Sequence, residues 1–189
     1  MRNYVQILVG TLLIAVAVCS RTIFHVPNFA ALAGVGLFSG FYFRSQMAYV
    51  IPLLAVLISD FFIGFYDLGS MAFVYAAWML PVLIGKWKLS MPALNKYISS
   101  FLVIGAKAVL ASLSFYVVSN LGVWLFSGMY SLSLSGLIEC YVMAVPFFRA
   151  TILGDILFSG VLFGTYYLVE TISLSRKSSL SYSVVEQKA

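Results

Sequence analysis

Long apolar runs separated by short polar segments make up most of the chain. A helix needs about 20 apolar residues to cross a bilayer, and these runs approach that length. They predict about six transmembrane helices, with tight turns at residues 44–46 and 66–69. The expected spans comprise residues 4–20, 28–43, 47–65, 70–85, 97–121 and 148–169.

The last third of the chain follows this pattern less clearly. Residues 122–136 mix aromatic rings with serines, which is typical of a loop at the membrane interface. The apolar region 137–172 is too long for one simple span. We therefore expect a short helix or re-entrant piece through Pro146, followed by the sixth span.

Composition supports a bilayer as the natural solvent of this chain. Of its 189 residues, 62% are hydrophobic and only 9% are charged, against about 25% charged residues in a typical soluble domain. The sequence predicts an all-α integral membrane bundle, with one transmembrane domain over residues 1–172. Residues 173–189 are expected to form a polar, mobile cytoplasmic tail.

The basic residues predict the orientation of the bundle. If the amino terminus is inside, the only basic residue in the outer loops is Arg21. The inner segments then hold Arg2, Arg44, Lys86, Lys88, Lys96, Arg176, Lys177 and Lys188. This asymmetry follows the positive-inside rule and places both termini in the cytoplasm.

Several classes of function are disfavoured by what the sequence lacks. It has no glycine-rich phosphate loop with lysine, and its single histidine provides no pair for a metal or haem. Its positive residues are scattered, which is not typical of nucleic-acid binding. We therefore expect that the protein is not an enzyme and that it uses no cofactor. The sequence does not decide whether Cys19 and Cys140 form a single disulfide.

Charged residues inside the predicted spans are costly in a bilayer and are functional candidates. We expect Lys107 to pair with Asp155, and Arg149 to pair with Asp60 or Glu139, although the sequence does not choose among these partners. Lys107 and Asp155 are interpreted as a structural ion pair. The other three charges lie near the outer half, where a solute would enter.

Further polar residues gather on the predicted outer side. Asn28 is also a candidate cap for the second span. Polar groups among aromatic rings are typical of small-molecule sites, although interface anchoring explains the rings equally well. The predicted substrate-binding residues are Arg21, His25, Asn28, Asp60, Asn120, Trp124, Tyr130, Glu139 and Arg149.

Rows of small residues recur at a spacing of four. One row occupies the first span (Thr11, Ala15 and Cys19), and others occupy the second span (Ala30 and Gly34, then Gly36 and Gly40). Small residues let helices approach closely. They either pack helices within the chain or dock a partner membrane subunit.

Four sequence runs together resemble an uncharacterised family of small bacterial membrane proteins. The runs are His25-Val26-Pro27-Asn28-Phe29, Ser59-Asp60 followed by Gly64, Ser119-Asn120-Leu121-Gly122-Val123-Trp124, and Pro146-Phe147-Phe148 followed by Gly154-Asp155. That family is in turn similar to the S-components of energy-coupling-factor transporters, which are six-helix vitamin-capture proteins with both termini inside.

The resemblance implies a function and a set of partners. It implies an outer pocket for a small nutrient, such as a vitamin or modified base, in the cell membrane of a bacterium. It also implies a transmembrane coupling subunit and two cytoplasmic ATPases, docked through the small-residue row of the first span. Thr11, Ala15 and Cys19 depart there from the usual alanine pair.

Two other functions stay open from the sequence. One is a self-sufficient carrier or channel, in which Asp60, Lys107 and Asp155 form a proton relay. The other is a non-catalytic structural membrane subunit.

Overall fold

The computed structural model describes residues 2–23, 28–88 and 96–186, without the side chains of residues 2, 96, 97 and 176–186. Within these ranges the regular structure is helical and contains no strand. The helices are α1 (Arg2–Ile23), α2 (Leu32–Tyr42), α3 (Met47–Ile63), α4 (Leu68–Ala77), α5 (Leu80–Lys86), α6 (Lys96–Phe126) and α7 (Leu134–Glu186).

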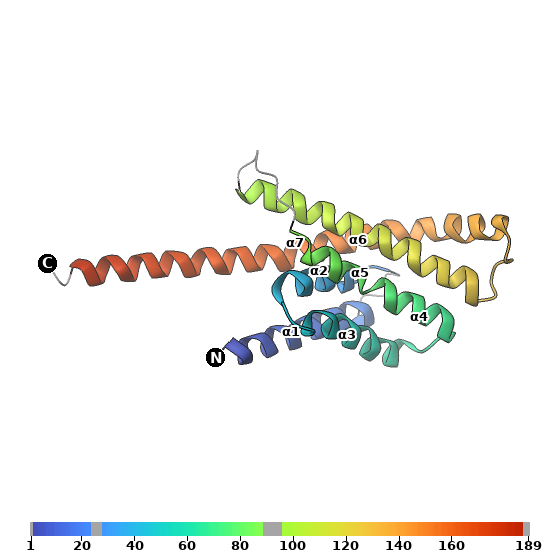
Figure 1. Cartoon of the computed structure of the whole chain (residues 1–189), viewed down its shortest axis with the longest axis horizontal. Coiled ribbons are helices and arrows are strands. Elements are labelled where there is room, and N and C mark those ends of the chain that lie inside the picture. The colour runs from blue at the N-terminus through green and yellow to red at the C-terminus, as the bar shows by residue number, and fades with distance from the viewer. Residues whose placement is uncertain (1, 24–27, 89–95, 187–189) are drawn as a thin grey trace.

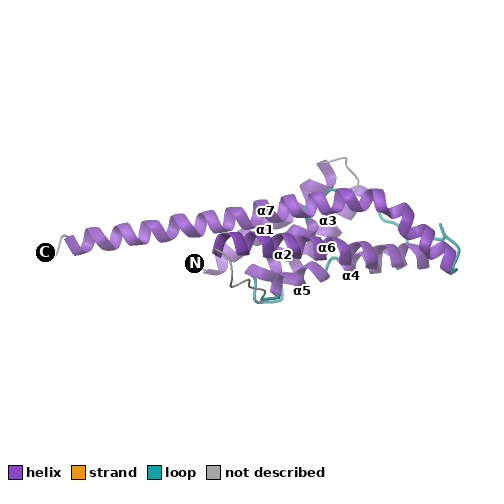
Figure 2. Ribbon diagram, turned by 90° about the horizontal axis from the view of Figure 1, so that it is seen from above, coloured by secondary structure: helices purple, strands orange, loops and turns teal. Residues whose placement is uncertain are grey.

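Successive spans alternate in direction along one bundle. Both termini lie at the same end, and the turn between α6 and α7 lies at the opposite end (Figure 1). The same arrangement is visible from above, where α7 extends far beyond the other helices (Figure 2). We call the end with the termini the inner end and the opposite end the outer end.

Within the described ranges, four helical segments are long and apolar enough to cross a membrane, which indicates a membrane protein. One of them joins α4 to α5 across Trp78 and Met79, where Pro81 begins the new helix without needing a backbone donor. The helices α2 and α3 are shorter. With 11 residues, α2 covers about 17 Å, much less than the roughly 30 Å of a bilayer core.

The short helix α2 is the buried centre of the bundle. Every residue from Leu32 to Gly40 is buried, and the helix packs against α3, α5 and α7. A side chain at Gly40 would collide with the backbone of Val82 in α5, and one at Gly85 in α5 would collide with the backbone of Leu37. The glycines of α2 therefore serve packing within this chain.

The start of α2 differs from the predicted one. Its capping residue is Ala31 and not Asn28, so the predicted asparagine cap is wrong. Asn28 has a φ of 61°, the left-handed conformation that asparagine tolerates in turns. The Ala31 N–H instead donates to Ser20 Oγ of α1 at 2.9 Å. A hydroxyl on the preceding helix thus provides the cap.

The carboxyl-terminal third of the chain is more regularly helical than the sequence predicted. Helix α7 is continuous through Pro146, so the expected break there is wrong. Proline removes one backbone hydrogen bond, a loss that membrane helices tolerate. The predicted interfacial loop shrinks to residues 127–133, because α6 extends to Phe126. Helix α7 also continues to Glu186, where a mobile tail was expected.

The close contact between α2 and α5 predicts that an added methyl group destabilises the protein at Gly40 but not at Gly105. Gly40→Ala should lower the free energy of unfolding by about 1–3 kcal/mol, because the added methyl overlaps the α5 backbone. Gly105→Ala is the matched control, since nothing lies within 4 Å of the added carbon. It should be neutral or stabilising by at most about 1 kcal/mol. Denaturation of purified protein in detergent measures both, and equal effects would contradict the packing described.

Candidate functional site

A buried ion pair joins α1 to α3 near the outer end. The guanidinium Nη1 of Arg21 lies 2.7 Å from Asp60 Oδ1, and it also donates to the Oγ of Ser59. The Asp60 side chain is 1% exposed and that of Arg21 is 19% exposed. Both residues lie in the last turns of their helices, where a cation such as Arg21 is also favoured by the helix dipole. The neighbouring side chains of Ser59 and Asp60 thus both bind Arg21.

Two tyrosines complete the surroundings of Asp60. Tyr75 of α4 donates its hydroxyl to Asp60 Oδ2 at 3.0 Å. Tyr66 lies in the connection between α3 and α4 and is 42% exposed, and partial desolvation together with the negative charge of Asp60 raises its pKa to about 12. Like other tyrosine hydroxyls, that of Tyr66 is neutral at physiological pH and can donate a hydrogen bond. Three helices meet at this cluster, and both Asp60 oxygens have partners.

The predicted pair between Lys107 and Asp155 is wrong. The Lys107 ammonium donates to the carbonyl oxygens of Trp87 at 2.6 Å and Gly85 at 3.4 Å, at the end of α5. Asp155 instead accepts a hydrogen bond from the Ser112 hydroxyl of α6. The two residues occupy different levels of the bundle, because Lys107 lies more than one helical turn before Ser112.

Asp155 belongs to a buried polar stripe along α7. Thr151, Asp155 and Ser159 recur every four residues and are 4%, 1% and 0% exposed. The backbone of α7 at Ser159 lies against Gly34 of α2, since a carbon added at Gly34 would lie 3.0 Å from the Ser159 nitrogen. This stripe places a carboxyl group in the interior, with a hydroxyl from α6 as its neighbour.

Three other predicted residues lie near the outer end, Asn120 and Trp124 in the last part of α6 and Tyr130 in the turn that follows it. Trp124 donates its indole N–H to the Ser131 carbonyl at 2.9 Å, which fastens the turn to α6. The Asn120 amide donates to the carbonyl one turn earlier, at 2.8 Å. Tyr130 is half-buried in the turn. The Trp124 contact thus holds the outer turn against α6, whereas the Asn120 side chain bonds within α6 itself.

The remaining predicted residues are dispersed. Glu139 and Arg149 are exposed along α7, and Asp60 pairs with Arg21, so the expected Arg149–Asp60 pair is wrong. Asn28 is exposed, and His25 lies outside the described residues. Cys19 and Cys140 are free thiols, so the disulfide that the sequence left open is not formed. Among the predicted binding residues that the structure describes, Arg21 and Asp60 are the two joined by a direct side-chain contact.

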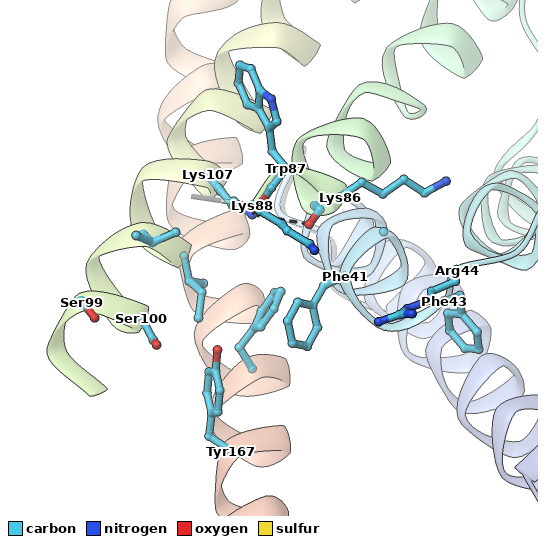
Figure 3. Close-up of a pocket in the computed structure, with 15 residues that line it drawn as sticks. Phe41, Phe43, Arg44, Lys86, Trp87, Lys88, Ser99, Ser100, Lys107 and Tyr167 are labelled. Carbon is cyan, nitrogen blue, oxygen red and sulfur yellow. Dashed lines mark hydrogen bonds between the residues drawn. The ribbon is translucent and has the colours of Figure 1, made fainter. Parts of the chain in front are cut away.

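A large hollow lies instead at the inner end. It has a volume of about 690 Å³ and opens between α2, α5, α6 and α7. Figure 3 shows side chains from these helices around the opening. Its walls combine cations with aromatic rings, and its described lining residues are Gly40, Phe41, Phe43, Arg44, Gly85, Lys86, Trp87, Lys88, Ser99, Ser100, Val103, Ile104, Lys107, Phe163 and Tyr167.

The comparison with known protein families covers nearly the whole chain. A family model described as a family of unknown function, DUF6580, matches residues 1–178. The chain belongs to DUF6580. The resemblance to an uncharacterised family is thereby confirmed at this level. No curated protein and no solved structure matches the chain significantly.

The DUF6580 chain contains functional candidates that the sequence analysis missed. Of the basic residues of the inner hollow, Arg44, Lys86 and Lys88 were interpreted only as markers of orientation, and Lys107 only as half of an ion pair. Asp155 was recognised, but its neighbours Thr151 and Ser159 were not, although polar residues at a spacing of four in an apolar helix share one face. Tyr75 has no such signal, since only the approach of α4 to α3 brings it to Asp60.

The Arg21–Asp60 pair predicts strong coupling between two single substitutions. Asp60→Asn or Arg21→Gln alone should lower the free energy of unfolding by about 3 kcal/mol. This loss is near the lower limit measured for buried ion pairs, because the Arg21 side chain is still 19% exposed. The double variant should lose clearly less than the sum. Denaturant titrations of the four proteins measure the coupling, with exposed Glu170→Gln as control. Additive losses would show that the pair contributes no interaction energy.

Proposed function

We propose that this protein is a membrane transport protein, namely the substrate-binding subunit for uptake of a small nutrient such as a vitamin or modified base. The observation that carries the proposal is the Arg21–Asp60 pair, which is held with Tyr75 in the outer part of an apolar bundle. Charged groups at such depth are expensive and mark solute or ion sites in membrane proteins. The proposal includes no catalytic role.

Surrounding residues on the outer side support a binding role. The cluster lies at the end of α1, directly before the segment that leads to His25 and Asn28. Tyr66 adds a neutral hydroxyl donor beside Asp60. Charged, amide and aromatic groups are the combination that orients a small polar solute. We therefore keep Asn120, Trp124, Tyr130, Glu139 and Arg149 as proposed outer contacts.

The source of energy is proposed to lie in partner proteins, as in S-components of energy-coupling-factor transporters. Thr11, Ala15 and Cys19 are exposed on α1, whereas Leu13 and Ala17 of the same helix are buried. The small-residue row thus faces away from the bundle and is available to a transmembrane coupling subunit and its ATPases. The proposed location is the cytoplasmic membrane of a bacterium, with both termini inside.

A binding experiment tests this proposal. Purified protein is titrated with a panel of vitamins and modified bases, and the best ligand is then measured against variants. Asp60→Asn should weaken binding at least tenfold, because the carboxylate orients Arg21 and Tyr75. Glu170→Gln removes an exposed carboxylate on the inner half of α7 and should bind normally. Absence of any tight ligand and of a co-purifying ATPase would contradict the proposal, as would full binding by Asp60→Asn.

A self-sufficient carrier is the second candidate, favoured by the environment of Asp155. This buried carboxyl group has a hydroxyl neighbour and no ion pair among the described residues. Intramembrane carboxyl groups of this kind serve proton-coupled carriers. Solute uptake by the protein alone in vesicles with a proton gradient, lost in Asp155→Asn, would favour this candidate over the binding subunit.

A further inference from the structure

The inner hollow combines a cationic rim with apolar walls. Arg44, Lys86, Lys88 and Lys107 line it, and no carboxylate is found among the described residues that line it. Phe163 and Tyr167 of α7 form part of the wall. A concentration of positive charge without negative partners favours an anionic ligand.

Two of these cations are available to a ligand. Lys107 is held by carbonyl oxygens of α5, and the Lys86 ammonium lies 4.0 Å from the centre of the Tyr49 ring. Arg44 and Lys88 are exposed and form no ion pair within the described part of the chain. Figure 3 shows the Arg44 and Lys88 side chains extending toward the hollow, whereas Lys86 points away from it.

An apolar groove continues from this hollow. It has a volume of about 190 Å³ and shares Ser100, Ile104, Phe163 and Tyr167 with the larger hollow. Its floor contains Gly160 and Gly164, where an added side chain would meet nothing within 4 Å. Its rim includes Phe101, which is 69% exposed. The groove between α6 and α7 thus opens on the surface that faces lipid.

We propose that the inner hollow binds the phosphate-bearing headgroup of an anionic phospholipid, with one acyl chain in the groove between α6 and α7. Arg44 and Lys88 provide charge-assisted hydrogen bonds to the phosphate oxygens. The glycines of α7 leave room for the chain. Basic hollows between helices on the cytoplasmic side are suited to anionic headgroups, which the inner leaflet supplies at high local concentration. This inference is independent of the outer solute site.

The charge requirement is tested by lipid titration of the full chain in mild detergent, followed by native mass spectrometry. Phosphatidylglycerol should bind at least tenfold more tightly than phosphatidylcholine with identical chains. The double variant Arg44→Gln/Lys88→Gln should reduce this preference to twofold or less, whereas Arg44→Lys/Lys88→Arg should keep it. Arg149→Gln, an exposed cation outside the hollow, should also keep it. Equal binding of the two lipids, or an undiminished preference in the double Gln variant, would overturn the proposal.

The groove requirement separates a lipid from a soluble phosphate compound. Gly164→Leu fills the groove and should weaken phosphatidylglycerol binding at least fivefold. Gly105→Leu adds the same side chain at an open position that lines neither hollow, and it should have no effect. Glycerol phosphate, which has the headgroup charge without chains, should not displace the lipid at millimolar concentration. Displacement by glycerol phosphate together with full binding by Gly164→Leu would assign the hollow to a soluble phosphate and overturn the lipid assignment.

Discussion

The close approach of α2 to its neighbours is the constraint on which the other contacts of the bundle depend. Its nine residues from Leu32 to Gly40 are buried, so neighbouring helices must contact it on every side. Small residues make this possible, because Gly40 and Gly85 bring the backbones of α2 and α5 into direct contact. Van der Waals packing of this kind is the main source of helix association in lipid, where hydrophobic burial adds little.

The same central helix separates two different chemical environments. Toward the outer end, Ser20 caps α2, and the next residue of α1, Arg21, reaches Asp60 of α3. Toward the inner end, α2 is followed by Arg44, which forms no ion pair among the described residues. One end thus holds a neutralised pair and the other holds unpaired cations. A buried pair is costly to assemble, and we propose that the Arg21–Asp60 pair serves solute recognition as well as helix packing.

Hydropathy predicted the helices well, because a run of apolar residues is sufficient to locate a helix in lipid. It overestimated the length of α2, since a short helix buried by protein and a full transmembrane helix have the same apolar composition. It also predicted a break at Pro146, because proline alone does not reveal whether neighbours tolerate a missing hydrogen bond. Helix existence is therefore a local property, whereas helix length and continuity depend on the surroundings.

The site was harder to predict than the fold. Arg21 and Asp60 were both recognised, yet Arg21 was assigned to a loop and the pair was not foreseen, because helix α1 extends further than its apolar run. The partners of Lys107 and Asp155 depend on the vertical offset between α6 and its neighbours, which a sequence does not contain. The inner hollow was missed because basic residues that mark orientation look identical to basic residues that bind an anion.

We propose that the Arg21–Asp60 pair recognises a solute and does more than hold α1 against α3. The most direct measurement is solute binding by the charge-swapped variant Arg21→Asp/Asp60→Arg, with the unfolding midpoint recorded in the same preparation. The swap keeps one positive and one negative group in contact but reverses their places. If the pair recognises the solute, the swapped protein should unfold at a midpoint closer to wild type than either single variant and should lose solute binding. A swapped protein that binds its solute as tightly as wild type would show that the pair is purely structural.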